Sequence, residues 1–219
     1  CILVIAPKKV AETVWSDEIE KWDHLNGMQL VKILGTEKER SLALLKKSSM
    51  YIINRENVAW LVAKLGISWP FDTVVIDELS SFKNHKSQRF KALRLVRNLC
   101  KRMIGLTGTP APNGLMDLWA EVFLLDKGIR LGESYERYRE KYFEADKRDG
   151  HTVFSYKLKE GDTLLGEDFY EKEIFNRIGD ICFSMKTEDY TNLPDRIDNN
   201  RYITLPSEIQ DKYDQFEEE

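Results

Sequence analysis

No glycine in this sequence is followed by lysine, although 12 glycines occur. A Gly-Lys-Ser/Thr loop binds nucleotide phosphates through backbone N–H groups and the lysine, so it requires that pair. The 219 residues therefore contain no phosphate-binding loop of this type. The chain opens on Cys1 directly in an apolar run, and we expect such a loop, where the whole protein has one, to lie before this residue.

Patterns typical of metal sites and disulfide frameworks are also missing. The cysteines and histidines are dispersed along the chain, at Cys1, Cys100, Cys182, His24, His85 and His151. Without a Cys-x-x-Cys pair, this spacing argues against zinc and disulfides, and it favours a reducing cytoplasm. No apolar run approaches the roughly 20 residues of a membrane-spanning helix, so we expect no membrane partner.

Charge is distributed unevenly around a net value of −4. Residues 1–110 carry 18 basic and 11 acidic side chains, whereas residues 111–219 carry 15 basic and 26 acidic ones. A basic first half can attract a phosphate backbone to one face of the protein. The segment Lys83–Arg102, with eight basic residues and no acidic one, is alternatively a solvated helix face. Its apolar stripe is Leu93, Val96, Leu99 and Cys100, and we expect Lys91, Arg94, Arg97 and Lys101 to point away from the core.

Short apolar runs rich in Val and Ile alternate with segments of helical periodicity. The runs predict strands at Ile2–Ala6, Leu30–Leu34, Met50–Asn54, Thr73–Asp77 and Arg102–Thr107. The other segments predict helices at Val10–Trp22, Glu37–Lys47, Val58–Leu65, Ser87–Leu99 and Leu115–Leu125. Continuously apolar strands are typical of parallel sheets buried on both faces. The predicted fold class is therefore α/β, with a doubly wound, mostly parallel sheet.

The pattern changes after the last of these helices. Ser134–Phe143 and Glu167–Arg177 have the spacing of amphipathic helices, and His151–Leu158 alternates like a hairpin arm. We therefore divide the chain into a core at 1–129, a mainly helical insertion at 130–185, and a return to the core at 186–219. Aromatic residues of the insertion suit either stacking on nucleic-acid bases or packing against neighbouring helices.

Two adjacent carboxylates, Asp77 and Glu78, follow the fourth predicted strand. In nucleoside-triphosphate hydrolases, one such carboxylate holds Mg²⁺ through water and the next polarises the attacking water. Adjacent strand residues point to opposite faces, so both can serve only if the strand ends at Asp77 and the chain turns. Pro7 and Thr107 fall at the carboxyl ends of two other strands, which is the edge where such sheets bind ligands. The alternative for the carboxylates is a solvated strand end.

Taken in order, the motifs cover most of the chain. They are Leu3–Pro7 with Val14-Trp15 and Glu18–Trp22; Tyr51–Asn54; Asp77-Glu78 with Phe82–Asn84; Thr107–Pro110 with Asn113 and Leu118-Trp119; and Leu193-Pro194, Leu205-Pro206 and Gln210–Tyr213. This ordered set resembles the first RecA-like lobe of a Swi/Snf-type superfamily two helicase-like ATPase, in its short bacterial or bacteriophage form. The insertion near residues 130–185 has no clear match to that pattern.

The resemblance implies a role for each matched residue. Asp77 and Glu78 are the catalytic pair of a DExH-like box, with Asp77 holding Mg²⁺ through water. Ser80, Thr107, Gly108 and Thr109 relay the state of the nucleotide, and Pro7, Lys8, Lys9 and Asn54 contact nucleic acid. The implied cofactors are ATP and Mg²⁺. The implied partners are double-stranded DNA and a second RecA-like lobe of the same parent protein, in the cytoplasm of a bacterial cell or phage-infected host.

Several local alternatives stay open. Ser80 stands where the family often has His, so the linkage through this position is uncertain from the sequence. Asn54 suits a helix cap as well as a nucleic-acid contact, and Thr107–Pro110 is also an ordinary turn sequence. Lys83 and Asn84 receive no role. We expect Trp15, Trp22, Trp60 and Trp119 to be core or helix-packing residues.

Two functions therefore compete at this stage. The first is part of an ATP-driven translocase or helicase acting on double-stranded DNA. The second is a nucleic-acid-binding or scaffold module that keeps the helicase fold without hydrolysing ATP.

Overall fold

A computed structural model describes residues 1–25, 27–108, 114–149, 152–161 and 166–185, with residues 199, 206, 209, 210 and 213. The chain forms two units, Cys1–Cys182 and Phe183–Glu219. The second unit has few described residues, and Leu193-Pro194, Leu205 and Asp211-Lys212 of the predicted final motif lie outside them. The first unit carries the sheet and the candidate site. Its division at residue 129, like the rest of the domain scheme, stays a prediction.

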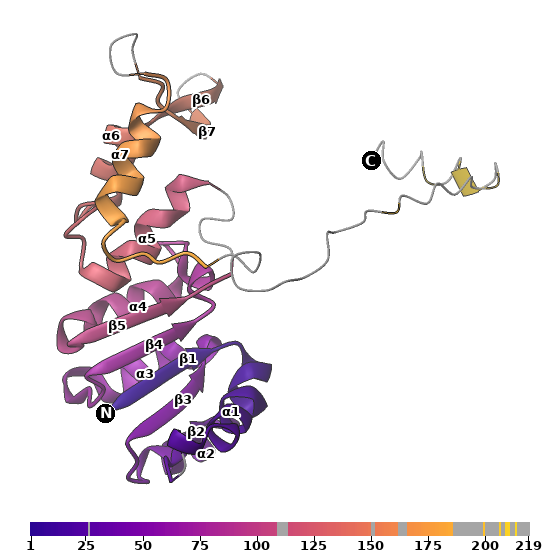
Figure 1. Ribbon diagram of the computed structural model, residues 1–219, viewed down its shortest axis with the longest axis vertical. Coiled ribbons are helices and arrows are strands. Elements are labelled where there is room, and N and C mark those ends of the chain that lie inside the picture. Colours follow the sequence, from indigo (N-terminus) through magenta and orange to yellow (C-terminus); the bar gives the residue numbers. More distant parts are fainter. Residues whose placement is uncertain are drawn as a thin grey trace. The chain divides into compact units, whose positions relative to one another are not determined.

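The core of the first unit is a five-stranded, all-parallel sheet with the strand order β2-β3-β1-β4-β5 (Figure 1). Its strands are β1 Ile2–Ala6, β2 Leu30–Ile33, β3 Met50–Asn54, β4 Thr73–Asp77 and β5 Arg102–Leu106. All five predicted strands are confirmed, with β2 and β5 each ending one residue earlier than predicted. The predicted α/β class is confirmed as well.

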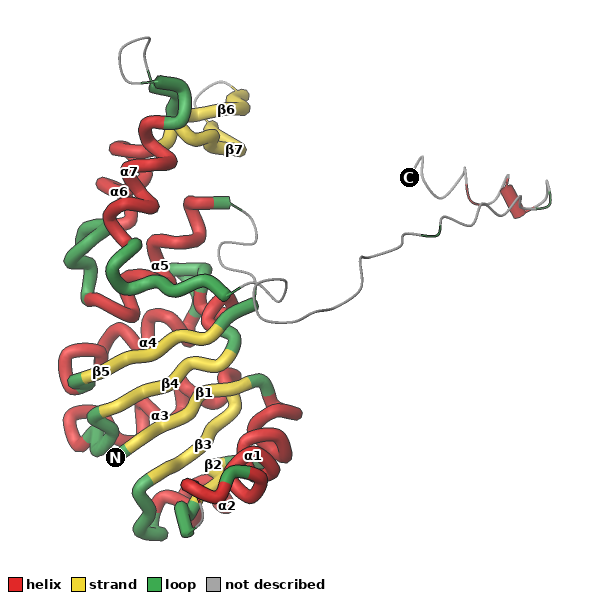
Figure 2. The backbone as a smooth tube through the Cα atoms, viewed as in Figure 1, coloured by secondary structure: helices red, strands yellow, loops and turns green. Residues whose placement is uncertain are grey.

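Helices connect the strands and cover the sheet (Figure 2). They are α1 Trp15–Lys21, preceded by a π-helical turn at Val10–Val14, then α2 Glu37–Leu44, α3 Val58–Leu65, α4 Gln88–Val96 and α5 Leu115–Asp126. Short 3₁₀ turns follow or precede several of them, at Asp23–Leu25, Arg55–Asn57, Gly66–Ser68, Leu79–Phe82 and Arg97–Leu99. Side-chain caps explain where two helices begin, since Thr36 forms a capping box with Glu39 and Ser87 accepts a bond from the Phe90 N–H.

The apolar side chains of β1 to β4 alternate between two apolar clusters. Leu3 and Ile5 of β1 join a large cluster that includes residues of α3, α4 and α5, whereas Val4 and Ala6 join a smaller cluster with Ala11 and residues of α1. This period of two places one cluster on each face of the sheet. Helices thus lie on both faces of the sheet, as the doubly wound prediction requires.

One part of the smaller-cluster face carries exposed apolar side chains. Register places Val4 beside Val75 and Val75 beside Ile104, so these three side chains form a row on that face. Ile104 is 39% exposed and Leu106 is 46% exposed. In the ribbon, α3 and α4 lie behind β4 and β5, and the front of these strands is open (Figure 1). Such exposure is unusual for a parallel sheet, whose strands are normally covered on both faces.

The insertion contains two helices, α6 Tyr135–Tyr142 and α7 Phe169–Ile178, and an antiparallel hairpin of β6 Phe143–Asp149 and β7 Thr152–Leu158. Its tyrosines Tyr138 and Tyr142 are each 2% exposed, and the Tyr138 hydroxyl donates to the Leu115 carbonyl of α5 at 2.7 Å. These aromatic residues pack against neighbouring elements. The predicted arm at His151–Leu158 is β7, although His151 itself lies outside the described residues.

Within the described residues, no helix combines the length and the apolar character that crossing a membrane requires.

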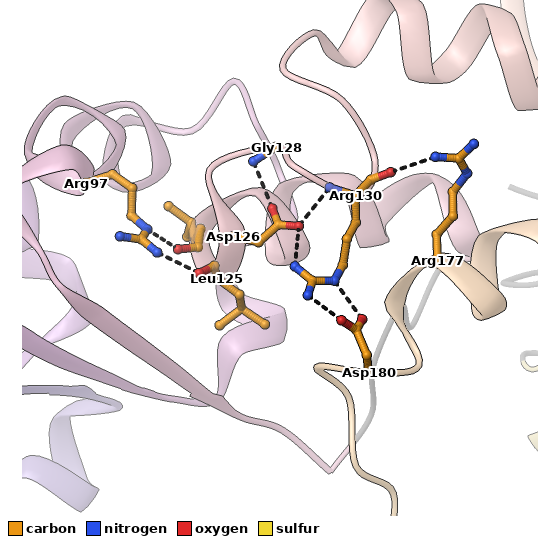
Figure 3. Close-up of polar contacts among 8 residues, drawn as sticks. Arg97, Leu125, Asp126, Gly128, Arg130, Arg177 and Asp180 are labelled. Carbon is orange, nitrogen blue, oxygen red and sulfur yellow. Dashed lines mark hydrogen bonds and ion pairs between the residues drawn. The ribbon is translucent and has the colours of Figure 1, made fainter.

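A polar network fixes the end of α5 (Figure 3). Asp126, with a side chain 4% exposed, accepts bonds from the Gly128 N–H at 2.8 Å and the Arg130 N–H at 2.9 Å. The Arg130 guanidinium reaches Asp126 and also makes a paired contact with Asp180, after α7, at 2.7 and 2.6 Å. This arrangement fastens the exit of the insertion to the end of α5.

Arg97 corrects one prediction, since it does not lie on a solvated helix face. Its guanidinium is buried and donates to the carbonyls of Leu124, Leu125 and Cys100. Three carbonyl acceptors compensate for the loss of water around the charge, although burial still lowers the pKa of Arg97. The helical spacing did not indicate this, because it assumed one continuous helix through Leu99. In the structure α4 ends at Val96, and Arg97 begins a 3₁₀ turn with a different side-chain direction.

We predict that Asp126→Ala destabilises the protein by about 1–3 kcal/mol, because it leaves buried N–H donors without an acceptor. Asp180→Ala, which removes a carboxylate that is 66% exposed, should cost much less. Chemical denaturation of both variants measures the difference. Equal losses would contradict the assignment of Asp126 as the buried centre of the network.

Candidate functional site

Three predicted signals meet at the carboxyl edge of the sheet. Pro7, Asp77 and Thr107 end or follow β1, β4 and β5, and these strands are consecutive neighbours in the sheet. Asp77 lies beside Leu106 in the β4–β5 register, one residue before Thr107. Segments that lie 70 and 30 residues apart in the sequence are thereby brought to one edge, as the strand pattern predicted.

The chain turns directly after Asp77. β4 ends there, and Glu78 adopts the left-handed conformation with φ of 65° and ψ of 64° before a 3₁₀ turn at Leu79–Phe82. A non-glycine residue in this region costs roughly 1–3 kcal/mol and is concentrated at functional sites. This turn is the condition under which adjacent carboxylates can both serve one site.

Glu78 joins the ends of two strands. Its Oε1 accepts hydrogen bonds from the Ser80 hydroxyl and from the Thr107 hydroxyl, the latter at 3.2 Å. The sequence left the linkage through Ser80 open, and the structure shows Ser80 and Thr107 on the same carboxylate oxygen. Gly105 of β5 lets the side chain of Leu79 pack close to this strand, because a Cβ at position 105 would lie 2.4 Å from that side chain.

Asp77 has a partner that the sequence did not reveal. The indole N–H of Trp15 donates to Asp77 Oδ2 at 2.9 Å, across 62 residues of sequence. The expectation that Trp15 only packs is therefore incomplete: the ring also contacts the smaller core cluster, but its polar end reaches the carboxylate. No sequence signal identifies this contact, because it depends on a π-helical turn just before Trp15.

The carboxylates suit a water-bridged Mg²⁺ better than a cage of protein ligands. Among the described residues, no group of three or more His, Cys, Asp and Glu side chains converges on one point. Mg²⁺ commonly uses one or two carboxylates, keeps several waters and takes its other ligands from substrate phosphates. Asp77 and Glu78 are both half-buried at the edge, and Asp77 Oδ1 accepts no hydrogen bond from the described residues. The carboxylates of Asp77 and Glu78 therefore fit a Mg²⁺ ion that is held through water.

The predicted nucleic-acid contacts divide into two kinds. Lys8 and Lys9 are exposed just after β1, and Lys8 makes a long contact of 4.0 Å with Glu12. Asn54, in contrast, is buried, and its side chain bonds those of Glu56 and Asn57 at 2.8 and 2.6 Å. Asn54 does lie at the N-cap position of the 3₁₀ turn Arg55–Asn57, as the helix-cap alternative expected, but its side chain makes no cap hydrogen bond there.

The segment after Glu78 touches α5 and the insertion. Lys83 pairs with Asp117 of α5 at 3.4 Å, and His85 stacks on Tyr135 of α6 with ring centroids 3.7 Å apart. The Asn84 side chain accepts from the Lys86 N–H and shapes the turn into α4. These contacts give Lys83, Asn84 and His85 structural roles that the sequence did not indicate. They also connect the turn that follows Glu78 to the insertion.

Of the remaining predicted coupling residues, Gly108 is exposed two residues after β5 ends. Thr109, and with it Pro110 and Asn113 of the same motif, lies outside the described residues.

The five-stranded, all-parallel sheet with its flanking helices is an α/β, RecA-like arrangement, and it matches the core of a SWI2/SNF2 ATPase. A family model of the SNF2-related domain matches residues 1–219. The chain belongs to the SNF2-related domain family.

Individual relatives agree with the family. The chain is 34% identical to putative protein p41 of Acyrthosiphon pisum secondary endosymbiont phage 1, over 99% of this chain and 47% of that protein. It is 34% identical to helicase SWR1 of Mycosarcoma maydis, over 56% of this chain and 7% of that protein. The chain therefore spans about half of the phage protein and a small part of the helicase.

A solved structure shows the same fold. The SWI2/SNF2 ATPase core of Sulfolobus solfataricus, in complex with double-stranded DNA, matches with a TM-score of 0.52 and 26% identity. The match covers 64% of this chain and 27% of that one.

We predict an energetic coupling between Glu78 and Thr107 of about 1 kcal/mol, the usual net value of one hydrogen bond. The measurement is a double-mutant cycle of Glu78→Ala and Thr107→Val by chemical denaturation. Glu56→Ala combined with Thr107→Val is the control and should be additive, since Glu56 bonds Asn54 at the end of another strand. Additivity in both cycles would show that the bond between the two strand ends contributes nothing.

Proposed function

We propose that this chain is part of an ATP-dependent motor that couples ATP hydrolysis to movement on double-stranded DNA. The observation that carries the proposal is the arrangement of Glu78, which the turn after β4 brings onto the Thr107 hydroxyl beside Asp77. Membership of the SNF2-related domain family supports it, as does the likeness to a SWI2/SNF2 ATPase core solved with double-stranded DNA.

Each carboxylate has its own task in this proposal. Asp77 holds a water of the Mg²⁺ shell, and Glu78 orients the attacking water and accepts its proton. When bound, Mg²⁺ neutralises charge on the phosphates of ATP. Ser80 and Thr107 hold Glu78 Oε1, so the carboxylate keeps one orientation until its neighbours move. A change at Glu78 during hydrolysis is thereby passed to the end of β5 and to Gly108.

The phosphate-binding residues come, in this proposal, from another part of the full-length protein. The open edge of β5 offers a place for a further strand, and the exposed Ile104 and Leu106 offer a surface for its helix. If a strand that precedes β1 in the chain pairs with β5, the connection from that strand to β1 runs across the sheet in the same direction as the connection from β1 to β2. Right-handed crossovers therefore place its helix on the same face as α1, which is the face that carries Ile104 and Leu106. A second lobe of the same protein would complete the site.

Double-stranded DNA is the nucleic acid along which we propose that the motor moves. Lys8 and Lys9 lie exposed at the start of the helix after β1, where backbone N–H groups add to their charge. The basic first half of the sequence supplies further attraction. Asn54 contributes by shaping its loop, because its amide is already engaged.

A non-hydrolysing scaffold is the second candidate function. A full-length protein without a Gly-Lys-Ser/Thr loop would favour the scaffold, whereas an intact loop would favour the motor. The two candidates differ in whether the full-length protein hydrolyses ATP, and in whether that hydrolysis depends on Glu78.

We predict that Glu78→Gln in the full-length protein lowers DNA-stimulated ATP hydrolysis by about 10²–10⁴-fold, because the amide cannot accept a proton from water. ATP affinity should change little, since size and hydrogen bonding are kept. Phosphate-release kinetics and fluorescent-nucleotide binding measure the two quantities, with Glu56→Gln as the matched control. Unchanged turnover in Glu78→Gln would assign the catalytic role elsewhere, and a wild-type protein without turnover would favour the scaffold.

We predict that replacing Lys8 and Lys9 with Ala weakens DNA binding to the same degree for every sequence, since lysines meet phosphates and not base edges. The slope of log affinity against log salt should become shallower by about 0.9 for each phosphate that the variant no longer neutralises. Lys46 and Lys47 form the control pair, because they are exposed but precede β3 at the opposite edge of the sheet. A sequence-dependent loss, or an equal loss in the control, would contradict the assignment.

A further inference from the structure

The helix after β1 is irregular at the point where it passes the carboxylates. A π-helical turn at Val10–Val14 precedes α1, which begins at Trp15. A π turn holds more residues than an α turn and so changes the direction of the side chains that follow, and such turns are frequent at functional sites. Here the first side chain after the turn is the one that reaches Asp77.

Trp15 is held from both sides. Its ring packs against the smaller core cluster, which includes Val4 and Ala6 of β1. Its Nε1 lies 2.9 Å from Asp77 Oδ2, and register places Asp77 on the same sheet face as that cluster. The indole therefore fills the space between α1 and the carboxyl end of β4, with its single donor directed at the carboxylate.

The chemistry of the donor suits a neighbour of a divalent cation. An indole N–H donates one hydrogen bond, accepts none and carries no charge. A lysine or arginine in this place would also hold the carboxylate, but its charge would repel a cation bound to the other oxygen. Trp15 can fix one oxygen of Asp77 without that repulsion.

We propose that Trp15 is a positioning residue for Asp77: it holds Oδ2 so that Oδ1 faces the Mg²⁺-bound water. The inference rests on the proposed function, and it assigns to Trp15 a role that packing alone does not require. Groups that orient a metal-binding side chain typically contribute 10–100-fold to metal affinity. We therefore expect the loss of the N–H donor to change the dependence of activity on Mg²⁺ more than it changes folding.

The test uses the full-length protein with the Trp15 indole replaced by benzothiophene, which has nearly the same shape but sulfur in place of N–H. Trp15→Phe is the second, simpler variant. Trp22→Phe is the matched control, because Trp22, which directly follows α1, donates its N–H to Glu18 at the exposed surface. The Mg²⁺ concentration for half-maximal ATP hydrolysis should rise about tenfold in the Trp15 variants and stay unchanged in the control. Maximal turnover at saturating Mg²⁺ and the thermal unfolding midpoint of the isosteric variant should change little.

A second readout does not depend on activity. The indole N–H resonance of Trp15, assigned from its absence in Trp15→Phe, should shift when Asp77→Asn removes the charged acceptor, while that of Trp22 stays in place. An unmoved Trp15 resonance would overturn the inference. So would identical Mg²⁺ dependence of the wild type and the isosteric variant in an active enzyme, and the proposed function would then still stand. A wild-type protein that neither binds nor hydrolyses Mg²⁺·ATP would instead overturn the proposed function, and this inference with it.

Discussion

The left-handed turn at Glu78 is the constraint on which the candidate site depends. It ends β4, separates the directions of two adjacent carboxylates and starts the 3₁₀ turn that packs Leu79 against Gly105. The cost of roughly 1–3 kcal/mol for this conformation is offset by packing of Leu79 and by the bonds that Ser80 and Thr107 donate to Glu78. The same turn continues to Lys83 and His85, whose contacts with Asp117 and Tyr135 brace it against α5 and α6.

Two carboxylates held by neutral donors define what this edge can do. Asp77 receives an indole N–H and Glu78 receives two hydroxyls, and no lysine or arginine is paired with either among the described residues. Their negative charge therefore stays available to a cation and to a water. The sheet face beside them carries the exposed side chains of Ile104 and Leu106. The function we propose requires phosphate-binding residues that pack onto β5.

The sequence predicted the sheet and its carboxyl edge because both follow from local rules. Runs such as Ile2–Ala6 and Thr73–Asp77 are too short and too β-branched for helices, and their continuous apolar character implies burial on both faces. What it missed depends on tertiary contacts. Trp15 donates to Asp77 across 62 residues of sequence, directly after a π turn that no periodicity indicates, and the polar role of Asn54 depends on a loop that closes on its amide. Arg97 is buried because three carbonyls happen to converge on it, which no periodicity of α4 could indicate.

The most direct measurement is a structure of the full-length protein with Mg²⁺, a transition-state analogue of ATP and double-stranded DNA. The account predicts the metal ion one water away from Asp77 and the γ-phosphate mimic within reach of a water held by Glu78. It also predicts a strand paired to β5, with its helix over Ile104 and Leu106. A nucleotide bound away from the carboxyl edge of β4, or an edge of β5 that stays open in the complete protein, would contradict it.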